Sequence, residues 1–216
     1  MKVSYFNNLP HHQPVGATFF ITFRLFGSIP AHVLNELKAE KDKRIRKLKR
    51  TKDRYSGQLE NEAKRYFAAF DNYMDKNSSG PHWLRDSNVA KIVTDKIHSF
   101  EKSYYDLIAY CIMSNHVHLL IDTANQLEEL NEDQIDDSYT QVYDFLKLLK
   151  GASAHEANQL IGRKGSFWEK GSYDHIVKNE KELRNIIDYI LQNPVKAGLT
   201  DEWQNWPHSF VNDRYL

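Results

Sequence analysis

Residues 107–121 read LIAYCIMSNHVHLLI, two apolar runs joined by Ser114 and Asn115. The first run is continuously apolar, which is typical of a central strand covered on both faces. Ser114 and Asn115 favour turns, so we expect a tight hairpin between the runs. In the second run His116 and His118 alternate with apolar residues, and a strand sends alternate side chains to one face. The two imidazoles are therefore expected to lie side by side, as half of a metal site.

Periodicity and turn residues predict the other elements. In chain order, we expect a strand over residues 16–26, one or two long helices over 31–74, a helix over 88–102, a loop over 125–137, a helix over 139–161 with a candidate interruption near Gly151, an extended segment over 166–178 and a helix over 179–193. Hairpins mixed with helices predict an α+β fold with a largely antiparallel sheet. A chain of 216 residues fits one domain, so we expect a single domain with a charged helical insertion at about residues 31–75.

The helix over residues 179–193 has the clearest signals. Asn179 fits an N-cap because Glu182 follows three residues later, as in a capping box. Proline disfavours helical geometry in the residue before it, so Pro194 is expected to end the helix at Asn193. Tyr189 and Asn193 are four residues apart, which makes them neighbours on the helix surface.

These residue types together predict phosphoryl-transfer chemistry. An amide oxygen is a hard ligand suited to Mg²⁺ or Mn²⁺, so Asn193 can complete a metal site with His116 and His118. Such a metal polarises a phosphoryl oxygen and offsets charge in the transition state. Tyr189, one helical turn from Asn193, can then attack the phosphorus. Its phenol has an ordinary pKa of about 10, so it needs help from the metal or from a base.

Charge is balanced overall, with 29 Lys and Arg against 29 Asp and Glu, but it is segregated. Residues 38–54 are rich in Lys and Arg, whereas residues 122–137 are acidic and contain neither. One face could therefore suit a polyanion.

Cys111 is the only cysteine, which excludes an intrachain disulfide and fits a reducing compartment. The first residues have no apolar signal core, and no stretch is long enough to span a membrane, so we expect a soluble, cytoplasmic protein with no membrane partner.

The chain resembles the REP-associated tyrosine transposases, within the IS200/IS605-like group of single-tyrosine HUH transposases. The similarity covers nearly the whole chain, and the charged helix over residues 34–65 is its least specific part. The matching stretches are GATFFITFRL at 16–25, WLRD at 83–86, MSNHVHLL at 113–120, AHE at 154–156, FWE at 167–169, YD at 173–174, DYI at 188–190, NPVKAGL at 193–199 and WP at 206–207.

The resemblance implies a ferredoxin-like α+β core and metal-dependent cleavage of single-stranded DNA through a 5′-phosphotyrosine intermediate. By motif match, His116 and His118 take the paired-histidine role and Tyr189 the nucleophile role. Asn193 matches the third-ligand position, where other members often have Gln. The substrates of the family are hairpin-forming repeats, so hairpin or single-stranded DNA is the implied partner. Relatives include both monomers and homodimers.

Several residues keep two interpretations. Tyr173 is an alternative nucleophile, although a strand aromatic is the simpler interpretation. Lys196 is a candidate phosphate contact or a solvated turn lysine. Trp168 can stack an unpaired base or pack in the core. Arg44 and Lys47, in the basic run, can hold a DNA stem through its phosphates or form a solvated helix face.

Two other functions also fit the sequence. A hairpin- or repeat-specific DNA-binding protein without cleavage would need only the fold and the basic helix. A metal hydrolase that uses water in place of Tyr189 would turn over without a trapped protein–DNA link. A strand-transferring endonuclease is the function that we favour, because the histidine pair and the tyrosine helix occur together in the matching order.

Overall fold

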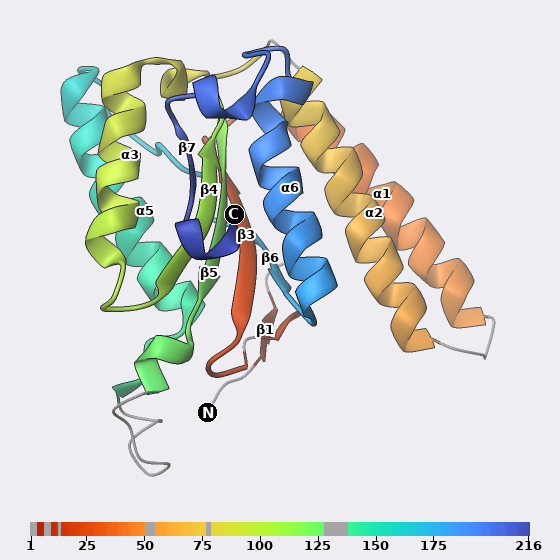
Figure 1. Cartoon of the computed structure of the whole chain (residues 1–216). Coiled ribbons are helices and arrows are strands. Elements are labelled where there is room, and N and C mark those ends of the chain that lie inside the picture. The colour runs from red at the N-terminus through yellow and green to blue at the C-terminus, as the bar shows by residue number, and fades with distance from the viewer. Residues whose placement is uncertain (1–3, 7–9, 13, 51–54, 77–78, 128–137) are drawn as a thin grey trace. The chain divides into compact units, whose positions relative to one another are not determined.

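The computed structural model describes residues 4–6, 10–12, 14–50, 55–76, 79–127 and 138–216 (Figure 1). The chain forms two compact units. The first combines Met1–Leu25 with His82–Leu216, and the second is Phe26–Pro81. Most of the predicted site residues lie in the first unit, whereas Arg44 and Lys47 lie in the second.

A five-stranded antiparallel sheet forms the centre of the first unit, in the order β6-β3-β5-β4-β7. Its strands are β3 (Thr18–Arg24), β4 (Asp106–Ile112), β5 (His116–Asp122), β6 (Tyr173–Ile176) and β7 (Ser209–Val211). Two short strands, β1 (Ser4–Phe6) and β2 (Pro10–His12), pair with each other. The helices are α3 (Ser87–Phe100), α5 (Val142–Leu160) and α6 (Glu180–Lys196), with short 3-10 helices η1 (Trp83–Arg85), η2 (Ala124–Leu127), η4 (Trp203–Asn205) and η5 (Asp213–Tyr215).

Two β-α-β units interleave in this sheet. The chain passes from β3 to β4 through α3, and these two strands lie on either side of β5. It passes from β5 to β6 through α5, and those two strands lie on either side of β3. This is the split β-α-β arrangement of ferredoxin-like folds. The predicted α+β class, antiparallel sheet and ferredoxin-like core are therefore confirmed.

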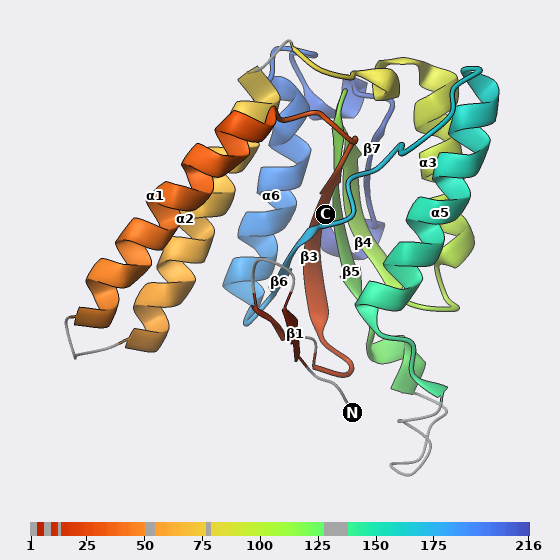
Figure 2. The same ribbon diagram turned by 180° about the vertical axis from the view of Figure 1, so that it is seen from behind.

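The helices divide between the two faces of the sheet. α3 and α5 lie on one face, and α6 covers the other (Figures 1 and 2). Phe19 and Phe23 belong to the hydrophobic core that includes α3 and α5, so Phe20 and Thr22 face the α6 side. Thr22 pairs with His118 in the β3–β5 register. Directly paired residues share a face, so the histidines also lie on the α6 side.

The predicted hairpin at Ser114 and Asn115 is confirmed. The N–H of Met113 donates to the carbonyl of His116 at 2.9 Å, which closes the turn. The carbonyl of Asn115 accepts a second bond from the N–H of Leu25 at 2.8 Å. The turn is therefore bonded both within the β4–β5 hairpin and to the residue that follows β3. These two bonds fix the position at which β5 begins.

The prediction that Pro194 ends the last helix at Asn193 is wrong, because α6 continues past it. A proline in the last turn removes one helical hydrogen bond but does not prevent the following residues from being helical. The helix ends instead at Lys196, with Ala197 as the C-cap, just before Gly198, whose φ is +68°. The N–H of Gly198 donates to the carbonyl of Val195 at 3.0 Å, and that of Leu199 to Pro194 at 2.9 Å. This is a Schellman motif, which glycine adopts without a Cβ clash.

The start of α6 is as predicted. The side chain of Asn179 accepts from the N–H of Glu182 at 2.9 Å, and the Glu182 carboxylate accepts from the N–H of Lys178 at 2.9 Å.

In contrast, α5 runs through Gly151 without the candidate interruption. The acidic stretch begins with η2 rather than with a loop, and its residues 128–137 lie outside the described residues.

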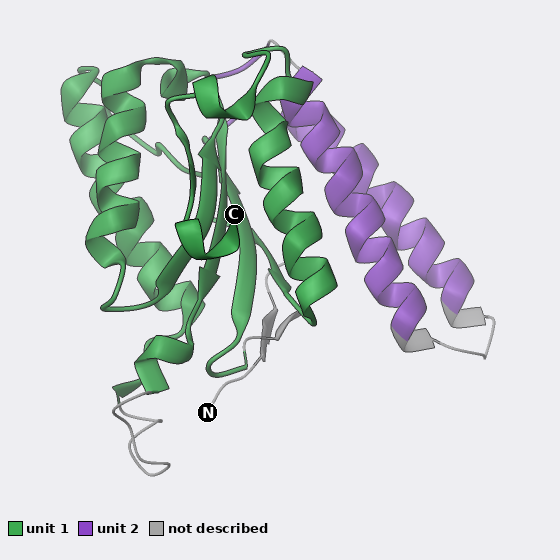
Figure 3. Cartoon of the chain, viewed as in Figure 1, with its two compact units in different colours: residues 1–25, 82–216 green, residues 26–81 purple. Residues whose placement is uncertain are grey.

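The second unit consists of two helices, α1 (Ala31–Arg50) and α2 (Tyr55–Lys76), which Figure 3 shows in purple. They pack together, with Arg44 donating to the Glu62 carboxylate at 2.6 Å. The sequence predicted one or two helices here, and there are two. The organisation as one domain with an insertion stays a prediction. Within the described ranges, no helix has the length and apolar character needed to cross a membrane.

Candidate metal and DNA-cleavage site

Two histidines form the centre of the candidate site. His116 and His118 are both fully buried on β5. Their Nε2 atoms are 3.0 Å apart, and their ring centroids are 4.7 Å apart. The prediction that the two imidazoles lie side by side on one face is therefore confirmed, and their Nε2 atoms converge.

A polar neighbour orients each imidazole through its Nδ1 atom. Nδ1 of His116 lies 2.7 Å from Oδ1 of Asn115, and Nδ1 of His118 lies 2.8 Å from Oγ1 of Thr22. When each Nδ1 carries the proton and donates it to these oxygens, both Nε2 lone pairs point to the same place. Orienting bonds of this kind fix the tautomer of histidines that bind metals.

Burial also sets the charge of the second histidine. Desolvation lowers the pKa of His118 from 6.5 to about 3, because the charged ring would be cut off from water. The ring of Phe20 stacks on it at a centroid distance of 5.7 Å. His118 is therefore neutral at physiological pH, which is the protonation state that a metal ligand needs.

The donor set fits a divalent cation. In a six-coordinate site, two neighbouring ligand atoms make an angle of about 90° at the metal, and each lies about 2.1 Å from it. These two atoms are then about 3.0 Å apart. The two Nε2 atoms have this separation. Asn193 is buried on α6, and its amide nitrogen donates to the carbonyl of Tyr189 at 3.2 Å. That bond occupies the nitrogen and leaves the amide oxygen, the atom that Mg²⁺ or Mn²⁺ prefers.

Tyr189 lies against the histidine site. Its ring centroid is 5.5 Å from that of His118 and 5.9 Å from that of Phe20, edge-on in both cases. Nζ of Lys196 lies over the Tyr189 ring, 5.3 Å from its centre, as in a cation–π contact. The spacing along α6 therefore brings the predicted nucleophile and the predicted phosphate contact together beside the imidazoles.

Tyr173, the alternative nucleophile, is on the same face of the sheet. It pairs with Thr22 in the β3–β6 register, and its ring is edge-on to Phe20 at 6.2 Å. The two tyrosines therefore contact the same phenylalanine from β6 and from α6. Tyr189 also contacts His118, edge-on at a centroid distance of 5.5 Å.

The remaining predicted residues lie elsewhere. Trp168 is only 6% exposed, and its Nε1–H donates to Oγ of Ser153 at 3.0 Å, which favours the packing interpretation of its ring. In the second unit, Arg44 is ion-paired with Glu40 and Glu62, whereas Lys47 is exposed.

Sequence reasoning missed Thr22, Asn115 and Arg24. Arg24 pairs with His116 in the β3–β5 register, is 8% exposed and forms an ion pair with Glu169 at 3.4 Å. The alternation of Thr22 and Arg24 along their strand was visible in the sequence. Their position opposite the histidines was not, because it depends on the pairing register.

Two curated relatives carry the same description. The chain is 31% identical over 127 residues to a protein of Haemophilus influenzae described as a REP-associated tyrosine transposase, and the match spans 54% of this chain and 69% of that protein. A REP-associated tyrosine transposase of Escherichia coli is 36% identical over 44 residues, which are 20% of this chain and 27% of that protein. No family model matches the chain.

A solved structure shares the fold. It is that of a REP-associated tyrosine transposase bound to a REP hairpin. The match covers 94% of this chain and 82% of that chain, with a TM-score of 0.51 and 15% sequence identity. At this level of identity the likeness shows the fold alone.

Proposed function

Because this chain belongs to the family of REP-associated tyrosine transposases, we propose that it cleaves and rejoins single-stranded DNA beside hairpin-forming repeats, with Tyr189 as the nucleophile. One observation carries the proposal. The Tyr189 ring is in edge contact with His118, whose Nε2 converges with that of His116 at 3.0 Å. A nucleophile beside two convergent imidazole nitrogens is an arrangement suited to activated phosphoryl transfer.

His116, His118 and Asn193 would hold the metal, which is Mg²⁺ or Mn²⁺ in this proposal. When bound, the metal polarises the scissile phosphate and offsets the charge that develops on its oxygens. Asn115 and Thr22 hold the imidazoles in the orientation that presents both Nε2 atoms. The partly buried hydrogen bond from Asn193 to the Tyr189 carbonyl couples the proposed third ligand to the helical turn that carries the nucleophile.

In the cleavage step, the phenolic oxygen of Tyr189 attacks the phosphorus and forms a new phosphodiester bond. The bond from phosphorus to the 3′-oxygen breaks. The phenol gives up one proton and the leaving 3′-oxygen takes one up, so the products are a 5′-phosphotyrosine and a free 3′-OH. One phosphodiester replaces another, and a 3′-OH can therefore reverse the step and rejoin DNA. Lys196, beside the phenol, is the proposed phosphate contact.

Hairpin or single-stranded DNA is the proposed partner. Lys47 is exposed on α1, and Arg44 is on the same helix. We propose that this basic stretch contacts the phosphates of a DNA stem, which predicts an affinity that falls as salt rises. Because Arg44 is ion-paired with Glu62 at 2.6 Å, Lys47 is the stronger candidate of the two.

The test is a search for a covalent protein–DNA adduct on denaturing gels. The protein is incubated with Mn²⁺ and labelled hairpins, with flanking single strands, built from repeats of its own genome. We expect a shifted band that is lost in Tyr189→Phe and in His116→Ala and that persists in Tyr173→Phe. The Tyr173 variant is the matched control, because both tyrosines contact Phe20.

Other outcomes assign a different function. An adduct that persists in Tyr189→Phe and disappears in Tyr173→Phe would make Tyr173 the nucleophile. Hairpins that bind in native gels but are never cut would indicate a DNA-binding protein that does not cleave. Cleavage without an adduct, still present in Tyr189→Phe, would indicate a metal hydrolase that uses water.

A further inference from the structure

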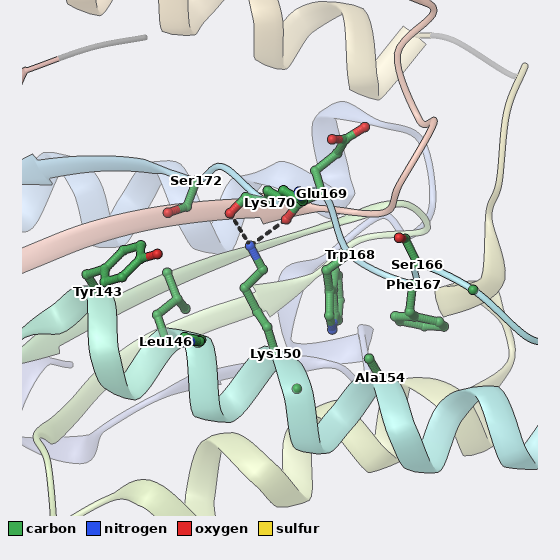
Figure 4. Close-up of a pocket in the computed structure, with 13 residues that line it drawn as sticks. Tyr143, Leu146, Lys150, Ala154, Ser166, Phe167, Trp168, Glu169, Lys170 and Ser172 are labelled. Carbon is green, nitrogen blue, oxygen red and sulfur yellow. Dashed lines mark hydrogen bonds between the residues drawn. The ribbon is translucent and has the colours of Figure 1, made fainter. Parts of the chain in front are cut away.

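A groove of about 450 Å³ lies in the first unit, away from the histidine pair, between α5 and residues 165–172 (Figure 4). Tyr143, Lys147 and Gly151 line it from the helix, and Trp168 and Lys170 line it from the opposite segment. Its volume is in the range of sites that hold small molecules or a single nucleotide.

Gly151 lines the groove, and its φ is not in the positive range that would demand glycine. Gly151 is in the interior of α5, where glycine is the least favourable residue apart from proline. A Cβ added at Gly151 would meet no atom within 4 Å outside the backbone of its own helix. Space kept open at this backbone position is what a bound group lying against the backbone would need.

The walls of the groove are held in place. The side chain of Lys150 crosses the groove, and its Nζ donates to the carbonyls of Glu169 and Lys170 at 2.5 and 3.1 Å (Figure 4). The same Nζ donates to the carbonyl of Gly171 at 3.5 Å. On the other wall, the Trp168 ring is fixed by its bond to Ser153. The groove is therefore formed before any ligand arrives, which lowers the cost of binding.

The lining favours a flat group with a negative charge. Tyr143 is 44% exposed and offers an aromatic ring beside the exposed cations Lys147 and Lys170. The carboxylate of Glu169 is paired with Arg24 at 3.4 Å, which reduces its repulsion of an anion. Aromatic rings interleaved with lysines are the usual means by which proteins hold unpaired nucleotides.

The groove connects to the histidine site around the edge of the sheet. α5 and α6 lie on opposite faces of the sheet (Figure 1). The groove is lined by α5, whereas the imidazoles lie on the α6 face. The N–H of Glu169 donates to the carbonyl of Arg24 at 2.9 Å, and Arg24 pairs with His116. A DNA strand leaving the histidines can therefore follow the segment after Glu169 into the groove.

We propose that this groove binds an unpaired nucleotide of the single strand that flanks the hairpin, an inference that rests on the proposed function. The base stacks on Tyr143 against the open backbone at Gly151. The adjoining phosphate is held by Lys147 and Lys170. The groove thus contributes to the choice of substrate, separately from the cleavage residues.

The test measures the affinity for a labelled oligothymidylate of about ten nucleotides, a length within the usual range for single-strand sites. EDTA is present throughout, so no cleavage is needed. Gly151→Leu fills the groove from its floor. Gly57→Leu is the matched control, because Gly57 is also in a helix and its Cβ would meet no atom within 4 Å. We expect the Kd to rise about tenfold or more in Gly151→Leu and in Tyr143→Ala, and to stay unchanged in Gly57→Leu.

The failure of this inference can be told apart from that of the proposed function. Equal Kd values in the parent protein and Gly151→Leu, with both proteins folded by circular dichroism, would overturn the proposed binding role of the groove, even if adducts form. A parent protein that does not bind the single strand would overturn it as well. Loss of single-strand affinity in Gly151→Leu would support the groove even if no hairpin is ever cleaved.

Discussion

Oγ1 of Thr22 lies 2.8 Å from Nδ1 of His118, across the ladder that joins β3 to β5. This bond links a residue of one strand to the candidate metal ligand of the next. It requires the observed register, in which the two residues are direct partners.

Replacing Thr22 with Val should therefore weaken metal binding. Valine has a similar shape but cannot hold the imidazole, and losing such an orienting partner typically costs about 10–100-fold in metal affinity. We expect the Mn²⁺ concentration for half-maximal adduct formation to rise by that factor. Thr18→Val is the control, because Thr18 also bonds across the same ladder, to Asp122 at 2.7 Å, at the far end of the strand. An equal effect of both variants would contradict the orienting role.

Replacing Asn193 with Ala should raise the metal requirement by about tenfold or more, because it removes the proposed third ligand. It also removes the hydrogen bond to the Tyr189 carbonyl. A Mn²⁺ titration separates these effects, since a lost ligand is compensated by more metal and a displaced tyrosine is not. Gln192→Ala, at an exposed position of the same helix, is the control. Full activity of Asn193→Ala at low Mn²⁺ would remove Asn193 from the metal site.

The metal-free protein should lose stability in acid because of His118. The pKa of this histidine is about 3 in the folded state and 6.5 when unperturbed. Between these values the unfolded chain binds a proton that the folded state does not. The stability is therefore complete above pH 6.5 and falls as the pH drops towards 3, with a slope of up to about 1.4 kcal/mol per pH unit.

Urea unfolding in EDTA at several pH values checks this prediction. The slope should be smaller in His118→Gln than in the parent protein. His155→Gln is the control, because His155 is exposed on α5. Parallel pH profiles for the parent and His118→Gln would show that His118 is not the group responsible.

Replacing Gly198 with Ala should destabilise the protein by about 1–2 kcal/mol, because a Cβ is unfavourable at a φ of +68°. A Cβ there would meet no atom within 4 Å, so the cost comes from the backbone alone. Gly151→Ala, at a helical position, should instead stabilise the protein by up to about 1 kcal/mol. Urea unfolding of both variants measures the contrast, and a neutral Gly198→Ala would mean that the Schellman motif does not hold the end of α6.

Local signals in the sequence predicted much of this structure. The turn at Ser114, the alternation of His116 with His118 and the N-cap at Asn179 each depend on neighbouring residues alone, and each was predicted as observed. The end of α6 was mispredicted because Pro194 was given more weight than Gly198. Both residues were visible, but a proline in the last turn does not prevent the residues after it from being helical, whereas glycine supplies the conformation that ends the helix.

What the sequence determined by itself is the set of reactive side chains and their local spacing: two imidazoles on one face of a strand, and Tyr189 one helical turn from Asn193. Only the tertiary structure decided which other residues join them. Thr22 and Arg24 lie opposite the histidines because of the strand register, and the groove at Gly151 exists because residues 165–172 pass beside α5. Spacing within one element follows from its backbone geometry, whereas contacts between elements depend on how the whole core packs.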